Sequence, residues 1–544
     1  MEPNERDGRQ RGLNIFTVFV LFVAVLGGML FGLDISTAAI TSMNTFRSDM
    51  GIPLLVPTVK DSTETTNQIT LFTVLFHVST MIGAPISGYI SDRVGRKRVI
   101  NIGCTIFMSG AIWQACAGLL SVSFAWTSIL LGRMLGGIGL GFILTVVPVY
   151  AAELSPSRYR GKVITLYQFN IVLGIFLGSL INQFVKDISW GWRLGFAVQS
   201  IPSAIIILLA LFVLPESPRS LIKRGYEADA RLALRRLTCS QWTNRTSVHN
   251  CNKQDIDPMI DYEVENILLE LAALKKAESS SFFDLFRGTA LPSFLCGFFI
   301  ALGQNITGIT WFLNYATQLF NNLGFDAFVM DLSIKCTLLG VTIIALFFID
   351  SFGRKFLMVW GTIGIILIFL INALVVVADT TSKDDSGTQS VQMFTLVMIF
   401  LFVAVYASGW GYLGWLIPAE VFPIHIRAKG MSTAVFANML TNIVLGDYGY
   451  VSLYAATSVS TAMFVLVALN VLFVLPAVVF LLPETKRVAL ENMNHIFAYV
   501  LGGNPNLGHG TMTDFFKANA YETKCILLCR GVIARRPNAV LSGV

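Results

Sequence analysis

The sequence alternates between long apolar runs and short charged segments. Twelve runs are each long enough to cross a hydrocarbon core of ~30 Å as a helix. They lack the polar–apolar alternation of a membrane barrel, and lipid offers no partner to unpaired backbone groups. The pattern therefore predicts an all-α bundle of twelve spans, near residues 14–37, 68–90, 99–118, 124–147, 163–183, 195–214, 291–319, 327–349, 357–377, 393–417, 430–453 and 461–482.

Composition also indicates a membrane protein. The chain has 544 residues, of which 54% are hydrophobic and 13% are charged, and its mean hydropathy is +0.67. A soluble domain carries roughly 25% charged residues. The net charge of +6 does not indicate nucleic-acid binding, because the basic residues are spread over the loops. Most of the 39 Lys and Arg residues lie on the side of the N-terminus, which predicts that both termini are cytoplasmic.

Charged residues at the ends of the spans repeat in the two halves of the chain. The repeated groups keep the same order and the same side of the membrane. They are Asp92, Gly95 and Arg96 with Asp350, Gly353 and Arg354; Glu153 and Arg160 with Glu420 and Arg427; and Glu216 with Glu484. This order predicts a parallel repeat of six spans, as in transporters that bind substrate between two halves.

The repeat divides the chain into five segments. We expect a cytoplasmic N-terminus at 1–13, a first six-helix half at 14–216, a linker at 217–290, a second half at 291–487 and a cytoplasmic tail at 488–544. In the linker, the apolar residues of 263–274 have helical spacing, which predicts short amphipathic helices on the cytoplasmic face. The tail is polar and Gly-rich, so we expect it to be partly disordered.

One acidic residue and one basic residue inside the spans form a candidate pair. Asp34 lies in the first span and Arg133 in the fourth. A charge at the bilayer centre costs ~2.5–3.5 kcal/mol or more, so such residues are functional candidates. An Asp34 carboxylate that breaks and re-forms its contact with Arg133 can load and release a proton, because burial and a nearby cation act on it in opposite directions. The alternative is a static ion pair.

A series of motifs then stands in one order along the chain. They are Gly28 to Asp34, Gly88 to Lys97, Gly132 to Gly137, Pro148 to Pro156 with Arg160, Gly191 to Arg193 with Gln199, Pro215 to Arg219, Glu420 to Pro423 with Arg427, and Pro483 to Lys486. Together they resemble the motifs of the sugar porter family of the major facilitator superfamily, over residues 14 to about 500. The resemblance implies a bundle of two pseudo-symmetric six-helix halves joined by a cytoplasmic helical linker.

The resemblance also implies a function. Members of this family are transporters and not enzymes, and an aspartate at the position of Asp34 is typical of proton symporters. We therefore expect a sugar–proton symporter that works as a monomer in the lipid bilayer of the plasma membrane, with no cofactor besides the coupling proton. Two alternatives stay open, an uncoupled facilitator of sugar or polyol and a transporter-like sugar sensor.

Charges at the cytoplasmic ends of the spans are expected to form a gate. In the family such residues form ion pairs between helices that close the inside. The candidates are Asp92, Arg96, Glu153, Arg160, Glu216, Arg354, Glu420, Arg427 and Glu484. The alternative is that they anchor helix ends at the interface. We also expect Asp92 to meet a helix N-terminus and the loop 88–97 to hold spans 2 and 3 against the other half.

The candidate sugar site consists of amide, hydroxyl and aromatic side chains. Four of them match the family pattern, namely Gln168, Gln304, Trp415 and Asn438. Three others depart from it, because Asn305 stands for a glutamine, Thr310 for an asparagine and Asn314 for a tyrosine. These departures favour a hexose other than glucose, or a polyol. The chain is similar in this respect to fungal proton-coupled fructose transporters.

Two further polar residues lie inside the spans. Lys335 in span 8 is expected either to reach the outer interface with its amine or to make a substrate or gating contact that faces the cavity. His77 in span 2 is expected to be a packed polar residue rather than a proton relay.

Overall fold

The computed structural model describes most of the chain. The described residues are 15–54, 63–119, 124–156, 159–238, 253–275, 286, 290–310, 312–313, 326–348, 353–382, 387–422, 426–449, 459–485, 519 and 523. Every regular element in these ranges is a helix.

The first half contains six helical spans. They are α2 (Ile15–Val25) with α3 (Gly27–Ser36) and η1 (Thr37–Ser42), α5 (Thr63–Val94), α6 (Arg96–Ala115), α7 (Ala125–Leu154), α8 (Arg160–Val185), and α9 (Gly191–Ala197) with α10 (Ser200–Phe212). The short helix α4 (Asn44–Met50) lies between the first two spans.

The second half repeats this arrangement. Its spans are α14 (Ala290–Ile306), α16 (Ala327–Phe348), α17 (Arg354–Ser382), α18 (Gly387–Ser408) with α19 (Trp410–Val421), α20 (Arg427–Thr441) with η6 (Asn442–Gly449), and α22 (Val459–Leu469) with η7 (Asn470–Val474) and η8 (Ala477–Leu481). The elements η6, η7 and η8 are π-helical. Such widened turns are frequent at functional sites.

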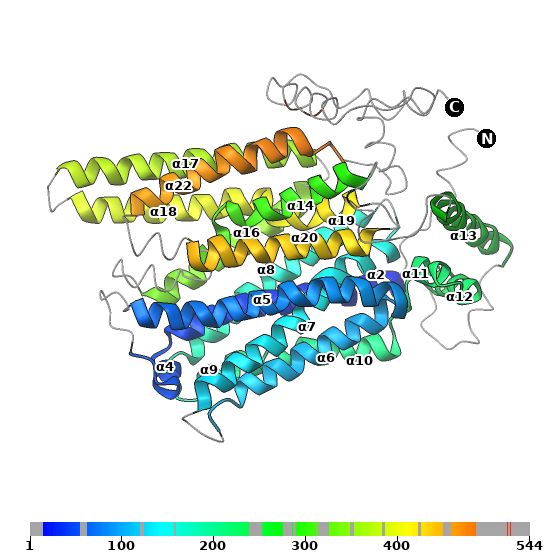
Figure 1. Cartoon of the computed structure of the whole chain (residues 1–544), viewed down its shortest axis with the longest axis horizontal. Coiled ribbons are helices and arrows are strands. Elements are labelled where there is room, and N and C mark those ends of the chain that lie inside the picture. The colour runs from blue at the N-terminus through cyan, green and yellow to red at the C-terminus, as the bar shows by residue number, and fades with distance from the viewer. Residues whose placement is uncertain are drawn as a thin grey trace.

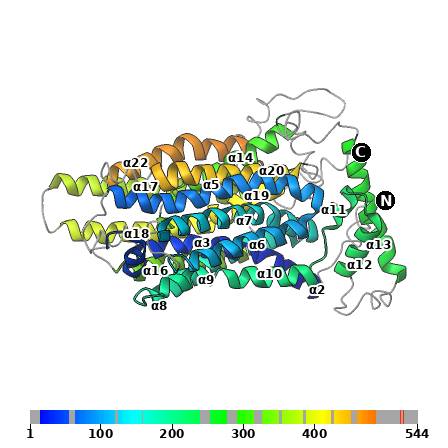
Figure 2. The same cartoon turned by 60° about the horizontal axis from the view of Figure 1, so that its bottom comes forward.

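The twelve-helix bundle expected from the sequence is confirmed. Nine segments of the described chain are long and apolar enough to cross a membrane, and α14 is a shorter apolar helix. The spans run side by side along the long axis (Figures 1 and 2). In the view of Figure 1, α17, α18 and α22 lie on one side and α6, α7 and α10 on the other. Where the halves meet, α5 packs on α20, and α8 packs on α16.

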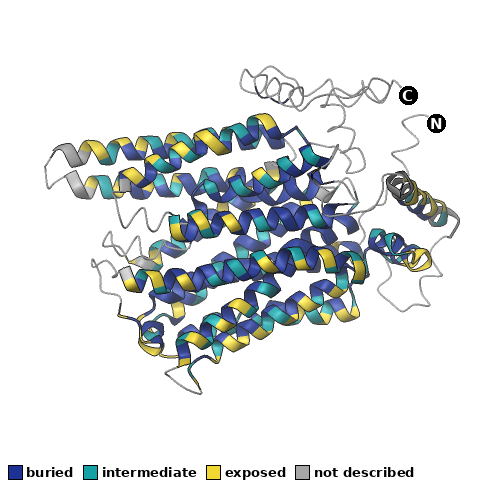
Figure 3. Ribbon diagram, in the orientation of Figure 1, coloured by how far each residue is buried: buried dark blue, intermediate teal, exposed yellow. Residues whose placement is uncertain are grey.

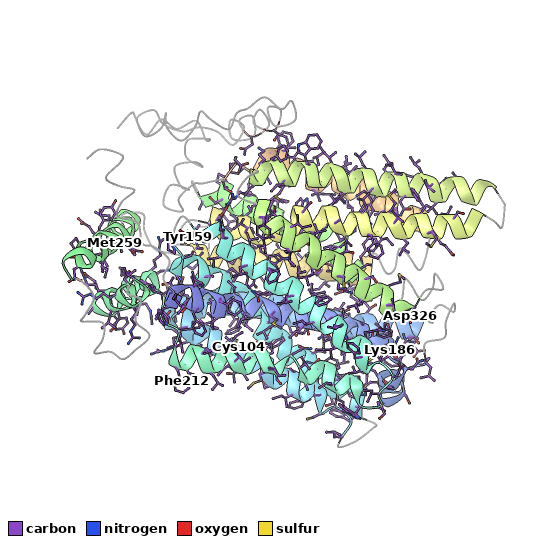
Figure 4. The ribbon with its side chains drawn as sticks, turned by 180° about the vertical axis from the view of Figure 1, so that it is seen from behind. Cys104, Tyr159, Lys186, Phe212, Met259 and Asp326 are labelled. Atoms are coloured by element: carbon purple, nitrogen blue, oxygen red, sulfur yellow. The ribbon has the colours of Figure 1, made fainter. Side chains whose placement is uncertain are left out.

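Three helices of the linker, two short ones and one of 23 residues, lie beyond one end of the bundle (Figure 1). They are α11 (Pro218–Lys223), α12 (Glu227–Thr238) and α13 (Lys253–Lys275). They share a small apolar core that includes Leu234 and Val264, as the amphipathic pattern predicts. We call this end of the bundle the linker end and the opposite one the distal end. Figure 4 shows α8 joining them, with Tyr159 near the linker end and Lys186 at the distal end.

The pattern of burial in the bundle is that of a protein surrounded by lipid. Large apolar side chains such as Phe212, Phe347 and Phe184 are 74–83% exposed, and exposed positions follow the outer faces of the helices (Figure 3). Many polar residues are buried between the spans, including Asp34, Arg133 and Lys335. A single buried charge is costly in lipid, so these residues must find partners inside the bundle.

Two described residues of the tail lie against the second half. The Asn519 side chain donates to the carbonyl of Phe480 at 2.9 Å, and the Asn519 carbonyl accepts from Lys355 Nζ at 2.8 Å. The Thr523 hydroxyl donates to the carbonyl of Val479 at 3.3 Å. This part of the tail is thus docked at the linker end, although its composition predicts partial disorder; the rest of the tail lies outside the described residues.

Candidate functional site

A cavity of about 60 Å³ lies between the halves. It receives side chains from both halves, and most of them are apolar or uncharged polar groups. The lining residues are Phe31, Ile35, His77, Gln168, Ile171, Val172, Ile175, Gln304, Asn305, Ile309, Thr310, Leu313, Leu338, Tyr406, Trp415, Asn438 and Asn442. Small-molecule sites in proteins commonly have this mixture of apolar walls and a few polar groups.

The predicted pair of Asp34 and Arg133 is formed and buried. Arg133 Nη1 donates to Asp34 Oδ1 at 2.5 Å, and Nη2 donates to Oδ2 at 3.4 Å. Both side chains are at most 4% exposed. The Thr37 hydroxyl accepts a further bond from Nη1 at 3.2 Å. Asp34 and Thr37 are one helical turn apart on the first span, so both face the fourth.

The Arg133 guanidinium also contacts two aromatic rings of α5. Its central carbon lies 4.3 Å from the ring centre of Phe72 and 4.1 Å from that of Phe76. Cation–π contacts of this kind are worth ~2 kcal/mol or more when desolvated. The guanidinium therefore has favourable contacts besides Asp34.

Four predicted sugar-site residues of the second half form one hydrogen-bonded network. Asn438 Nδ2 donates to Gln304 Oε1 at 2.8 Å, and Gln304 Nε2 donates to the carbonyl of Gly411 at 3.2 Å. Asn305 Nδ2 donates to the carbonyl of Asn438 at 2.8 Å. The Thr310 hydroxyl donates to Asn305 Oδ1 at 2.8 Å. The network fixes these amides against the cavity, so that a ligand meets an ordered polar wall.

Other cavity residues offer unpaired oxygens or an aromatic face. Gln168 Oε1 and Asn442 Oδ1 are buried and accept no hydrogen bond among the described residues. A buried acceptor without a partner is costly, so both oxygens are suited to a ligand that brings hydroxyl donors. Trp415 is also buried in the lining, with Phe31 and Tyr167 edge-on to it at centroid distances of 6.1 and 6.3 Å.

Gly414 allows α19 to approach Gln304. A Cβ at this position would lie 2.5 Å from Gln304 Cδ, which no real contact allows. The side chain of Gln304 therefore occupies the space that a larger residue of α19 would fill. A glycine at position 414 thus shapes the polar wall, although 414 is absent from the predicted site residues.

At the linker end of the first half, the predicted gate charges form a cluster. Arg96 donates to Asp92 at 3.0 Å and to Glu153 at 3.3 Å. Glu216 Oε1 accepts the backbone N–H groups of Arg96 and Lys97 at 2.8 and 3.3 Å. The N-terminus of α6 is therefore met by Glu216, whereas Asp92, expected there, accepts from the Arg96 side chain.

The second half builds a matching cluster. Arg354 Nη2 lies 3.8 Å from Glu420 Oε1. Glu484 accepts the backbone N–H groups of Arg354 and Lys355 at 2.9 and 3.2 Å. Thr485 donates to Glu420 at 3.1 Å, as Ser217 donates to Glu153 in the first half. The charged residues that repeat in the sequence thus make equivalent contacts in the two halves.

These ion pairs differ from the expectation in one respect. Within the described part of the chain, the ion pairs of Asp92 and Arg96 stay in the first half and its linker, so these two charges do not hold the loop 88–97 against the other half. The halves meet here through small residues. A Cβ on Gly88 would lie 3.0 Å from that of Ser432, and one on Gly161 would lie 2.8 Å from Arg354 Nη2. The two halves are therefore in close contact at the linker end.

Two predicted site residues cannot be placed. Asn314 and the side chain of Arg160 lie outside the described residues. Arg427, at the start of α20, is buried, and its Nε donates to the carbonyl of Phe422 at 3.1 Å.

Lys335 does not reach the outer interface and does not line the cavity. Its amine is buried and donates to Asp331 Oδ1, one turn earlier on α16, and to the carbonyl of Leu313 at 3.4 Å. Asp331 Oδ2 in turn accepts from the Ser179 hydroxyl of α8 at 3.1 Å. The spacing of four residues is a helical ion-pair signal, and sequence reasoning overlooked it.

His77 has a partner that sequence reasoning also overlooked. Its Nδ1 lies 2.7 Å from Oδ2 of Asp447, a carboxylate in η6 with no exposed surface. The two residues are 370 positions apart, so no local pattern links them. His77 is thus a packed polar residue, as expected, and also lines the cavity.

Comparison with known proteins agrees with this geometry. A family profile described as "Sugar (and other) transporter" matches residues 20–497. The chain belongs to the sugar transporter family. Among curated relatives, sugar transport protein MST7 of Oryza sativa subsp. japonica is 30% identical, with 89% of this chain and 92% of that protein covered. H(+)/hexose cotransporter 2 of Parachlorella kessleri is 30% identical, with 90% and 87% covered.

A solved structure of the proton:xylose symporter XylE bound to 6-bromo-6-deoxy-D-glucose has the same fold. Its TM-score is 0.73 at 24% identity, and 89% of this chain and 99% of that chain are covered. Membership of the sugar transporter family confirms the resemblance noted in the motifs. The protein is accordingly a multi-pass membrane transporter with the fold of XylE, and it is not an enzyme.

Proposed function

We propose that this member of the sugar transporter family is a proton-coupled hexose symporter of the plasma membrane. One observation carries the proposal: the buried Asp34–Arg133 pair lies in the same bundle as a cavity lined by amides and one tryptophan. The names of two relatives support it, since H(+)/hexose cotransporters 1 and 2 of Parachlorella kessleri are each 30% identical.

Asp34 is the proposed proton carrier. Its carboxylate has Arg133 as a partner and is almost free of solvent, so a proton can replace the guanidinium as the group that neutralises it. Arg133 retains the rings of Phe72 and Phe76 in that state. Protonation therefore loosens the contact between the first and fourth spans, and deprotonation restores it.

The sugar is proposed to bind in the cavity between the halves. Its hydroxyl groups would donate to Gln168 and Asn442, whose oxygens have no described donor. Its apolar ring face would lie on Trp415, as buried aromatic groups allow. A hexose other than glucose, with fructose first, is proposed because Asn305 replaces a glutamine and Thr310 replaces an asparagine of the family pattern, and because the two bond to each other.

Transport is proposed to proceed by alternating access, with the linker end and both termini in the cytoplasm. The close contacts of Gly88 and Gly161 support a state closed at that end. Rocking of the halves would open it while the charge clusters hold each half together. The proposed cycle is that of a monomer, and it uses no cofactor besides the proton.

The test is labelled uptake by cells that lack their own hexose carriers. A panel of hexoses, pentoses and polyols should be offered while the external pH is recorded. We expect one hexose to be taken up with alkalinisation of the medium. Uptake without alkalinisation would favour the facilitator, and binding without uptake would favour the sensor. Either result would refute the symporter.

A further inference from the structure

The bond between His77 and Asp447 crosses from one half to the other beside the cavity. His77 belongs to α5 in the first half, and Asp447 belongs to η6 in the second. His77 is 6% exposed and Asp447 is not exposed at all. A buried carboxylate with an imidazole partner inside a span is expensive and is a functional candidate by default. The proposed symport cycle has no use for either group.

Resting on the proposed function, we propose that His77 is a further sugar-binding residue, positioned by Asp447 from the opposite half. It would hydrogen-bond one hydroxyl of the sugar. The sugar site would then be complete when α5 and η6 are in contact, and substrate recognition would depend on both halves at the distal side of the cavity.

The chemistry of the imidazole supports this role. A carboxylate only accepts hydrogen bonds, so Nδ1 carries the hydrogen in the 2.7 Å bond to Asp447. In the neutral ring, Nε2 is then an acceptor with a fixed direction. No hydrogen bond to Nε2 is found within the described part of the chain. Since His77 lines the cavity, a sugar hydroxyl is a suitable donor for this nitrogen.

The neighbouring groups show why Asp447 is needed. The ring of His77 lies edge-on to Phe76 at a centroid distance of 6.2 Å, and Phe76 itself is against Arg133. An aromatic contact alone leaves the imidazole free to rotate about the Cβ–Cγ bond of His77. The bond to Asp447 removes this freedom and selects which nitrogen faces the cavity, as carboxylates do for histidines that bind metals.

The widened helix at η6 is the second structural support. Asp447 and Asn442 both lie on this π-helical segment, and Asn442 has an unpaired oxygen beside the cavity. A π-turn rotates side chains relative to an α-helix and is frequent at functional sites. One short segment thus presents a direct acceptor, Asn442, and the residue that holds a second acceptor, His77.

The experiment measures KM for uptake of the transported hexose and of each of its monodeoxy analogues. Wild type is compared with His77→Phe, which keeps a ring without nitrogens. We expect His77→Phe to raise KM for the parent sugar about fivefold to tenfold. One analogue lacks the hydroxyl that meets His77. For this analogue, the KM of wild type should already be raised by the same factor, and His77→Phe should raise it no further. This non-additivity is the signature of a direct contact.

Asp447→Asn tests the positioning role. We expect a smaller rise in KM with little change in kcat, and again none for that same analogue. His77→Gln, which can both donate and accept, should recover part of the affinity for the parent sugar. It also carries the test if His77→Phe fails to reach the membrane.

Asp331→Asn is the matched control, since Asp331 is also a buried carboxylate that bonds across the halves, through Ser179. It does not line the cavity, so it should change KM for all analogues by one common factor. A common factor for His77→Phe as well, or no change in KM, would overturn this inference while leaving symport intact. Absence of uptake of every sugar by wild type would instead refute the proposed function.

Discussion

Replacing Asp34 by asparagine should separate sugar movement from proton movement. The amide has almost the shape of a protonated carboxyl group, and its oxygen can still accept from Arg133 Nη1, now 2.5 Å from Asp34 Oδ1. The variant should therefore resemble the protonated carrier, which binds sugar. It has no carboxylate to load, so the cycle should run without a proton.

The size of the effect follows from the energy that the proton supplies. One charge moved through 100 mV is worth about 2.3 kcal/mol, which corresponds to about a fortyfold accumulation of sugar. Asp34→Asn should lose all of this, so that the inside concentration rises only to the outside concentration. Sugar exchange, which needs no net proton movement, should continue.

The stability cost should be moderate. Removing one partner of a buried ion pair typically costs about 3–5 kcal/mol, because a charge is left unpaired. Arg133 keeps its contacts with Thr37, Phe72 and Phe76. We therefore expect a loss below that range, and protein that still reaches the membrane.

The assay combines labelled uptake, external pH and exchange of preloaded sugar. Asp331→Asn is the matched control here too, because it removes another buried carboxylate with a cationic partner, Lys335, away from the cavity. It should keep accumulation. Alkalinisation of the medium by Asp34→Asn on addition of sugar would refute the assignment of the proton site.

Three further changes test other parts of the structure. Glu420→Gln should weaken the linker-end cluster of the second half, favour opening at that end and slow uptake about twofold to fivefold, with equilibrium sugar binding retained; unchanged uptake kinetics would contradict the gate. Gly414→Ala should raise KM for sugar about tenfold or more, because the added methyl group displaces Gln304. Gly411→Ala is the control. Its added carbon would lie 3.6 Å from the nearest atom, so KM should stay nearly unchanged. Glu216→Ala removes an acceptor for two N–H groups and should cost about 0.5–2 kcal/mol, measured by unfolding in detergent, and Glu216→Gln should recover most of it.

The sequence predicted the parts of the molecule that depend on local pattern. Each span follows from a run of apolar residues, and the two charge clusters follow from motifs repeated in the same order. The pairing of Asp34 with Arg133 could be predicted because a buried charge needs a partner of opposite sign. The partner of His77 could not be predicted in this way, because a histidine can pack against many kinds of residue.

Two of the contacts that were not predicted depend on how separate spans pack against each other. The bond from His77 to Asp447 requires α5 to lie beside η6, and it requires a π-helical segment that the apolar pattern of span 11 does not reveal. The closeness of Gly414 to Gln304 likewise depends on packing between two spans. A sequence pattern predicts which face of a single helix is buried, whereas these contacts depend on how two helices pack together.

The carboxylates of Glu216 and Glu484 have a consequence for synthesis of the protein. Each stands in the last few residues of its half and bonds to the start of that half's third span. The third span is made before this carboxylate, so its first N–H groups must bond to other acceptors, such as water, until translation reaches the end of the half. The contact can form only after all six spans of its half have been synthesised, and the one in the first half needs no residue of the second.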